Sequence, residues 1–80
     1  MKAFKRENVL SDGSKTFDVI VGGDFDWLSR INKMFDKVYE IEEFIPESNE
    51  LTIFAEDFFQ AEMIMHDIKK QAEIMIGRWE

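Results

Sequence analysis

The sequence predicts an α+β domain, a two-layer sandwich with the element order β-β-α-β-β-α. Three observations support this prediction: two pairs of β-favouring runs are each joined by a turn signal, an apolar helical stripe follows each pair, and 80 residues suffice for one domain, 1–80. Because each stripe needs an apolar surface to cover, we expect a mainly antiparallel four-stranded sheet with both helices on one face. The other face should remain open.

The first hairpin is predicted from residues 2–10 and 15–21, which flank the turn signal Ser11-Asp12-Gly13-Ser14. Alternation along the second strand divides its side chains between the two faces of the sheet. The core set is Phe17, Val19 and Val21, and the outward set is Thr16, Asp18 and Ile20.

The first helix is expected at residues 25–37, after a break at Gly22-Gly23. Asp24 is the expected N-cap, where an acid is favoured by the positive end of the helix dipole. The apolar side of this helix consists of Trp27, Leu28, Ile31, Met34, Phe35 and Val38.

The second hairpin is predicted from residues 38–45 and 51–55, joined by a five-residue loop from Pro46 to Glu50. The Glu42-Glu43 pair interrupts the alternation, which predicts a bulge or a strand end. The inner set is Tyr39, Ile41, Leu51, Ile53 and Ala55, and the outer set is Glu40, Glu42, Thr52 and Phe54.

A long helix should run from about Asp57 to Gly77. Its core stripe comprises Phe58, Ala61, Met65, Ile68, Ala72, Met75 and Trp79. A second apolar row, formed by Phe59, Met63 and Ile74, lies on the opposite side. A monomer does not need this row, so we expect it to contact a partner or a second copy, together with Phe54 on the outer sheet face.

Negative charge is concentrated in one segment. Residues 38–68 contain no Lys or Arg, whereas acids and bases nearly balance in the other residues. This charge argues against nucleic acid and anionic membranes as direct partners and favours basic proteins. The carboxylates of the segment are Glu40, Glu42, Glu43, Glu47, Glu50, Glu56, Asp57, Glu62 and Asp67.

Ordinary structural preferences explain part of this acidity. Helix starts favour Glu56 and Asp57, and Glu47 and Glu50 fall in a loop. Like charges that share a sheet face destabilise it, so the acids of the strands need another explanation. The candidate partner-binding face consists of Asp18, Glu40, Glu42 and Glu43, with Glu47 and Glu50 beside them.

Catalysis, metal binding and cofactor binding have little support. His66, the only histidine, follows Glu62 by four residues, but this pair fits a solvated helical face and lacks the third ligand that a metal needs. The chain has no Cys, and Ser11, Ser14 and Ser48 lie in turn segments. We therefore expect neither an enzyme nor a cofactor.

Three hypotheses follow. The leading one is a homodimeric protein whose acidic sheet face binds a basic protein, in one form a phage-type inhibitor that mimics the phosphate charge of DNA or RNA. A dimer would double the acidic track. The alternatives are an adaptor or assembly subunit that uses apolar helix contacts, and a small metal-binding protein or hydrolase centred on His66.

The lack of Cys, of a signal-peptide apolar run and of a membrane-length apolar run predicts a cytoplasmic location.

Overall fold

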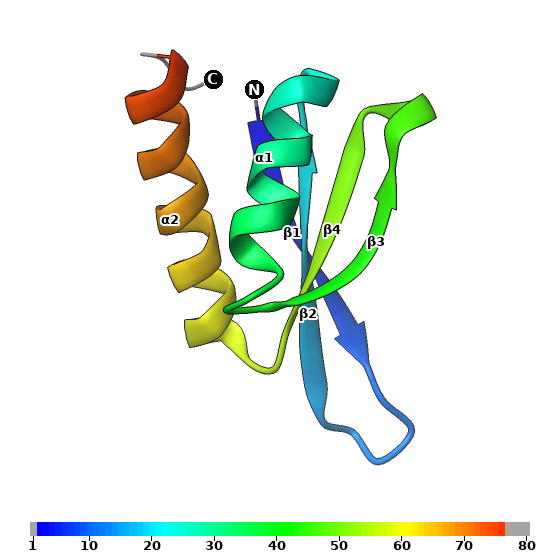
Figure 1. Ribbon diagram of the computed structural model, residues 1–80. Helices are drawn as coiled ribbons and strands as arrows, with labels where there is room; N and C mark the ends of the chain where they lie inside the picture. The colour runs from blue at the N-terminus through cyan, green and yellow to red at the C-terminus, as the bar shows by residue number, and fades with distance from the viewer. Residues whose placement is uncertain (1, 77–80) are drawn as a thin grey trace.

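The computed structural model describes residues 2–76 and confirms the predicted α+β fold (Figure 1). Both helices cover one face of a four-stranded sheet, which leaves the other face open. The elements are β1 (Lys2–Val9), β2 (Lys15–Gly22), α1 (Phe25–Phe35), β3 (Glu40–Ile45), the short 3-10 helix η1 (Pro46–Ser48), β4 (Glu50–Ala55) and α2 (Phe58–Ile76).

The strand order is β1-β2-β4-β3, and every neighbouring pair is antiparallel. The two hairpins therefore meet along β2 and β4, where Val19 lies opposite Ile53. In the first turn Gly13 has a φ of +87°, and the Asp12 carboxylate accepts hydrogen bonds from the backbone N–H and hydroxyl of Ser14 at 2.9 and 2.6 Å. The Asp-Gly turn predicted from the sequence is confirmed.

The core lies between the sheet and the two helices. The central strands contribute side chains that are fully buried, and these pack against the apolar stripes of α1 and α2. Burial of each Val, Leu or Ile side chain of this set contributes about 1.5–3 kcal/mol relative to exposure. The fully buried members are Val19, Val21, Leu28, Ile31, Leu51, Ile53, Ala55, Ala61, Ile64, Ile68 and Ala72.

Several predicted boundaries were wrong by one or two residues. The first helix ends at Phe35, because the backbone N–H groups of Val38 and Tyr39 both donate to the Phe35 carbonyl and form a turn. The third strand therefore begins at Glu40 instead of residue 38. Val38 is consequently 70% exposed, although it was expected on the apolar side of the helix.

Two other expected core residues are partly exposed. Met34 is 40% exposed, and Phe58, at the start of α2, is 49% exposed. The Phe58 ring contacts the edge of Phe17, with centroids 5.9 Å apart, and the Lys5 ammonium lies 4.5 Å from its centroid. The predicted helix end at Gly77 and the stripe residue Trp79 lie outside the described residues.

Candidate functional site: the open face of the sheet

The strand register brings four side chains into one row across the open face. Arg6 of β1 lies opposite Asp18 of β2, which lies opposite Phe54 of β4, which lies opposite Glu40 of β3. Residues opposite one another in neighbouring strands share a face of the sheet. Asp18, Phe54 and Glu40 were predicted on this face; Arg6 was missed. The hairpin register around Asp12 contained the signal, because Arg6 and Asp18 are equally distant from the turn.

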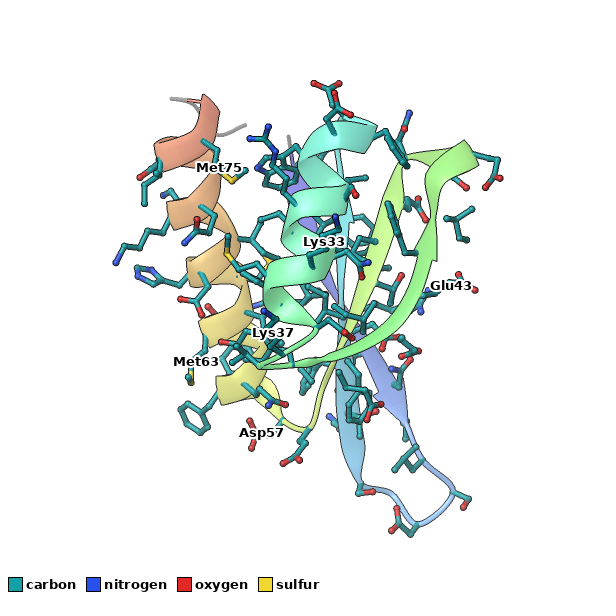
Figure 2. The ribbon with its side chains drawn as sticks, viewed as in Figure 1. Lys33, Lys37, Glu43, Asp57, Met63 and Met75 are labelled. Atoms are coloured by element: carbon teal, nitrogen blue, oxygen red, sulfur yellow. The ribbon has the colours of Figure 1, made fainter. Side chains whose placement is uncertain are left out.

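A bulge in β3 adds two more carboxylates to this face. Ile41 pairs with Ile53 on the core side, and Glu43 pairs with Thr52 on the open side, so Glu42 is the extra residue between them. This confirms the bulge predicted from the Glu42-Glu43 pair. Figure 2 shows Glu43 on the side of β3 remote from Met63 of α2.

Asp18 is on the open face but is only 2% exposed. Its Oδ2 accepts hydrogen bonds from Arg6 Nη2 at 2.7 Å and from Asn8 Nδ2 at 3.1 Å. Asp18 therefore cannot present its carboxylate directly to a partner, contrary to the expectation from its alternation. Its hydrogen bonds instead hold the side chains of Arg6 and Asn8 in place.

The carboxyl groups of Asp18 and Glu42 have pKa values shifted in opposite directions. Burial acts to raise the pKa of Asp18, but hydrogen bonds with Arg6, Asn8 and Glu42 outweigh it, and the pKa lies below the ordinary 3.8. The hydrogen bond with Asp18, together with burial and the Asp18 charge, raises the pKa of Glu42. Two ionised carboxylates only accept, so a proton on Glu42 makes the bond possible. Among the described residues the buried Oδ1 of Asp18 has no hydrogen-bond partner, so it is free to accept a bond from a protonated Glu42.

Five exposed glutamates form what we call the acidic face. They lie on β3, on η1 and at the start of β4. The ion pairs between described residues, Lys5–Glu62, Arg6–Asp18 and Lys15–Glu7, involve none of the five. The acidic face comprises Glu40, Glu42, Glu43, Glu47 and Glu50.

The apolar row on α2 belongs to the other layer of the molecule. Phe59, Met63 and Ile74 are 78%, 59% and 67% exposed. Within this region Asp67 Oδ2 accepts a hydrogen bond from the Tyr39 hydroxyl at 2.7 Å. Burial, together with this bond, raises the pKa of Tyr39 to about 12. The structure thus separates the α2 row from the acidic face and from Phe54.

His66 is exposed on α2, and Glu62, one turn before it, forms an ion pair with Lys5 of β1. Within residues 2–76 no three His, Asp or Glu side chains are grouped so that they could hold a metal ion. No observation therefore favours the hypothesis centred on His66.

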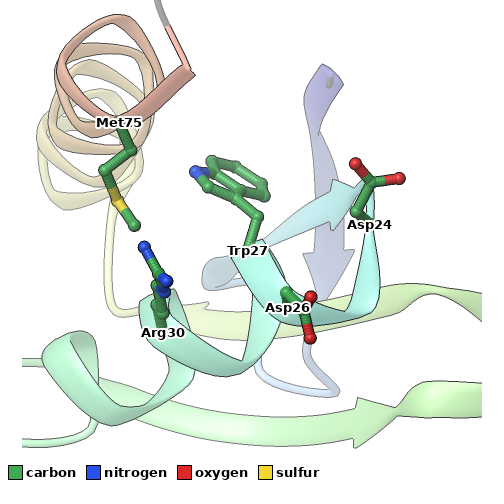
Figure 3. A pocket seen from close by; sticks show the side chains of 5 residues that line it. All are labelled: Asp24, Asp26, Trp27, Arg30 and Met75. Carbon is green, nitrogen blue, oxygen red and sulfur yellow. The ribbon is translucent and has the colours of Figure 1, made fainter.

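A cavity of about 270 Å³ lies between the start of α1 and the end of α2 (Figure 3). It is lined by the N-cap residue Asp24, by Asp26, Trp27 and Arg30 of α1, and by Met75 of α2, with Arg30 extending toward Met75. The Trp27 side chain is 3% exposed, and its Nε1 has no hydrogen-bond partner among the described residues. This cavity belongs to the helical layer and not to the acidic face.

No helix in the described part of the chain is both long enough and apolar enough to cross a membrane. Comparison of the chain with models of protein families, with curated proteins and with solved structures gives no significant match. The acidic face and the α2 row are therefore the two surfaces from which a function can be inferred.

Proposed function

We propose that the protein is a cytoplasmic, non-catalytic binding protein whose acidic face contacts a basic surface of another protein. The observation that supports this proposal is the grouping of five exposed glutamates on β3, η1 and β4, outside the ion pairs of the described residues. The strand register sets none of these acids directly opposite another, but Glu40, Glu42 and Glu43 follow one another closely along β3, so their like charges repel. A basic partner offsets this repulsion on binding.

A surface that binds nucleic acid is the partner chemistry that fits best. Such a surface presents Lys and Arg to phosphates, which on each strand of DNA follow one another every ~3.4 Å of helix axis. Neighbouring residues of a β-strand are about 3.3 Å apart, and the bulge at Glu42 brings consecutive acids onto one side of β3. Mimicry of nucleic acid, as in a phage-type inhibitor, is the specific form of this proposal.

The test is a pull-down of nucleic-acid-binding proteins with the whole chain as bait, eluted with increasing salt. We expect a captured protein that moderate salt releases and duplex DNA or RNA displaces, because the contact is electrostatic. The double variant that carries both Glu40→Gln and Glu43→Gln should not capture this protein. These two positions avoid Glu42, whose contact with Asp18 affects the fold.

The matched control is Glu56→Gln with Glu73→Gln, which changes the net charge equally but alters exposed positions outside the acidic face. Capture should persist in this control. Equal loss in both double variants would mean that only net charge matters, and equal retention in both would exclude the acidic face as the contact.

The second candidate is an adaptor or assembly role that uses apolar contacts. The exposure of Phe59, Met63 and Ile74 is the observation that favours it. A complex formed through this row should resist salt and should be unaffected by Glu40→Gln with Glu43→Gln, so the same salt series separates the two candidates. We propose a homodimer as the acting form in either case.

A further inference from the structure

We propose that the cavity between α1 and α2 binds a small zwitterion, a free α-amino acid with an apolar side chain. The cavity has a volume of about 270 Å³. Pockets for drug-sized ligands have volumes of ~300–1,000 Å³, so this cavity suits a smaller molecule. The site lies in the helical layer, so this inference goes beyond the proposed function and does not depend on the acidic face.

The indole N–H of Trp27 is a donor for which no described residue provides an acceptor. Trp27 is only 3% exposed, and a buried donor without a partner destabilises the fold. Figure 3 shows the indole nitrogen on the side of the ring that is nearer to Met75 and Arg30. Both of these side chains are long and flexible, so they can move aside and admit an acceptor atom of a ligand. The cavity therefore favours a ligand that carries such an acceptor.

Charged side chains of opposite sign line the cavity without pairing. Asp26 and Arg30 are four residues apart, a spacing at which ion pairs commonly form on a helix. Arg30 instead extends toward Met75, and the ion pairs between described residues include neither Asp26 nor Arg30 (Figure 3). Asp24, the N-cap, forms no side-chain capping bond. The cavity thus presents two carboxylates at the start of α1 and a guanidinium one turn further along the helix.

A free amino acid matches this order of groups. Its carboxylate can accept hydrogen bonds from Arg30 and from the Trp27 N–H, and its ammonium can donate to Asp24 and Asp26. The positive end of a helix disfavours a cation, but its charge of roughly +0.5 is smaller than the two negative charges of the acids. An apolar side chain of the ligand then contacts the Trp27 ring and Met75, the apolar part of the lining.

The test is a titration of the whole chain with free leucine, followed by ¹H–¹⁵N NMR. The chain has two Trp and therefore gives two indole N–H signals, and Trp79→Phe identifies the signal of Trp27. We expect a saturable downfield shift of this signal at millimolar leucine, because the indole N–H gains an acceptor.

Two analogues of leucine test the two charges of the ligand separately. Isoamylamine lacks the carboxylate, and 4-methylpentanoate lacks the ammonium. Each should bind about tenfold more weakly than leucine, because each loses one set of charge-assisted hydrogen bonds.

Variants of the lining test the position of the site. Arg30→Gln and Asp26→Asn should each raise the dissociation constant for leucine about threefold to tenfold, since each removes one charged contact. The matched controls are Lys33→Gln and Asp36→Asn, which make equal changes of charge at exposed residues near the end of α1, outside the lining. Both controls should bind leucine like the wild type. The dispersion of the backbone amide signals shows whether each variant remains folded.

Three outcomes would contradict the proposal. A Trp27 signal that does not move at leucine concentrations near the solubility limit overturns it. An equal affinity for 4-methylpentanoate and leucine overturns the assignment of a zwitterion, because the carboxylate alone then accounts for binding. Equal losses of affinity in Arg30→Gln and Lys33→Gln would mean that net charge, and not the cavity, determines binding.

Discussion

Asp18 and Glu42 are acids in contact on the open face of the sheet, and their contact couples the stability of the fold to pH. Asp18 has a lowered pKa, so its contribution is present above the ordinary value of 3.8 and is lost as pH falls through the lowered pKa. Glu42 has a raised pKa, so its contribution is complete below the ordinary value of 4.5 and is lost as pH rises through the raised pKa. The pair is therefore most favourable at mildly acidic pH.

Glu42→Gln should remove the loss of stability that the wild type shows as the pH rises toward 7. The Gln amide can donate to Asp18 at every pH, and it adds no negative charge beside the buried carboxylate. We expect the variant to be more stable than the wild type at pH 7 by about 1 kcal/mol, the size of one net hydrogen bond. At about pH 4 the difference should nearly vanish. Urea denaturation across this pH range measures it.

Glu43→Gln is the matched control, because it makes the same chemical change at a neighbouring exposed residue. It should leave the pH profile of the wild type almost unchanged. A Glu42→Gln profile parallel to that of the wild type would show that the two carboxyls do not share a proton.

Alternation predicted the face on which Asp18 lies but not its burial. The face follows from the local period of a β-strand, which needs only the neighbouring residues. Burial depends on Arg6 and Asn8 from β1 and on Glu42 from the β3 bulge. The hairpin register already contained the signal for Arg6, but β3 reaches Asp18 only through the strand order, so the sequence could not reveal the contact with Glu42.

The acids at the starts of the two helices differ in whether they form capping hydrogen bonds. At the start of α2 the Gln60 N–H donates to Asp57 Oδ1 at 2.8 Å, and Gln60 Oε1 accepts from the Glu56 N–H at 2.6 Å. This reciprocal pair resembles a capping box. At the start of α1 Asp24 occupies the N-cap position but makes no side-chain capping bond.

Asp57→Ala should therefore destabilise the fold by about 1 kcal/mol, the usual effect of losing a capping side chain. Asp24→Ala should have a smaller effect, about 0.3–0.5 kcal/mol, because only the interaction of its charge with the helix dipole is lost. Thermal or urea denaturation of both variants at neutral pH gives the comparison. Equal effects would mean that the Asp57 hydrogen bond adds no stability.

Sequence patterns located the four strands and the two α-helices because their signals are local; the short helix η1 was expected only as a loop. The Glu42-Glu43 pair predicted the bulge, and the acids at residues 56 and 57 predicted the start of α2. The misplaced start of β3 has two causes, a local turn after α1 and a tertiary contact with α2. Tyr39 has strand propensity, but its backbone continues the turn after α1, and its hydroxyl donates to Asp67 of α2. Tertiary contacts of this kind override propensity.

The acidic face and the α2 row lie in different layers of the molecule. The acidic face occupies the sheet layer, whereas the α2 row occupies the helical layer. The sequence predicted both surfaces, but it did not predict the order β1-β2-β4-β3, since several orders satisfy the same alternation. That order places β3 at an edge of the sheet, where its acids have a neighbouring strand on one side only.

Repulsion within the acidic face should reduce the stability of the whole fold, which has a net charge of −7. Glu40→Gln with Glu43→Gln should raise the free energy of unfolding by about 0.5 kcal/mol at low ionic strength. The gain should shrink in about 1 M NaCl, where the screening length is only about 3 Å. Glu56→Gln with Glu73→Gln should give a smaller gain, since Glu56 lies beside the positive end of the α2 dipole. Denaturation of both double variants at the two salt concentrations tests this. If the variant with Glu40→Gln and Glu43→Gln is less stable than the wild type, these two acids stabilise the fold. The acidity of the face would then need no partner to explain it.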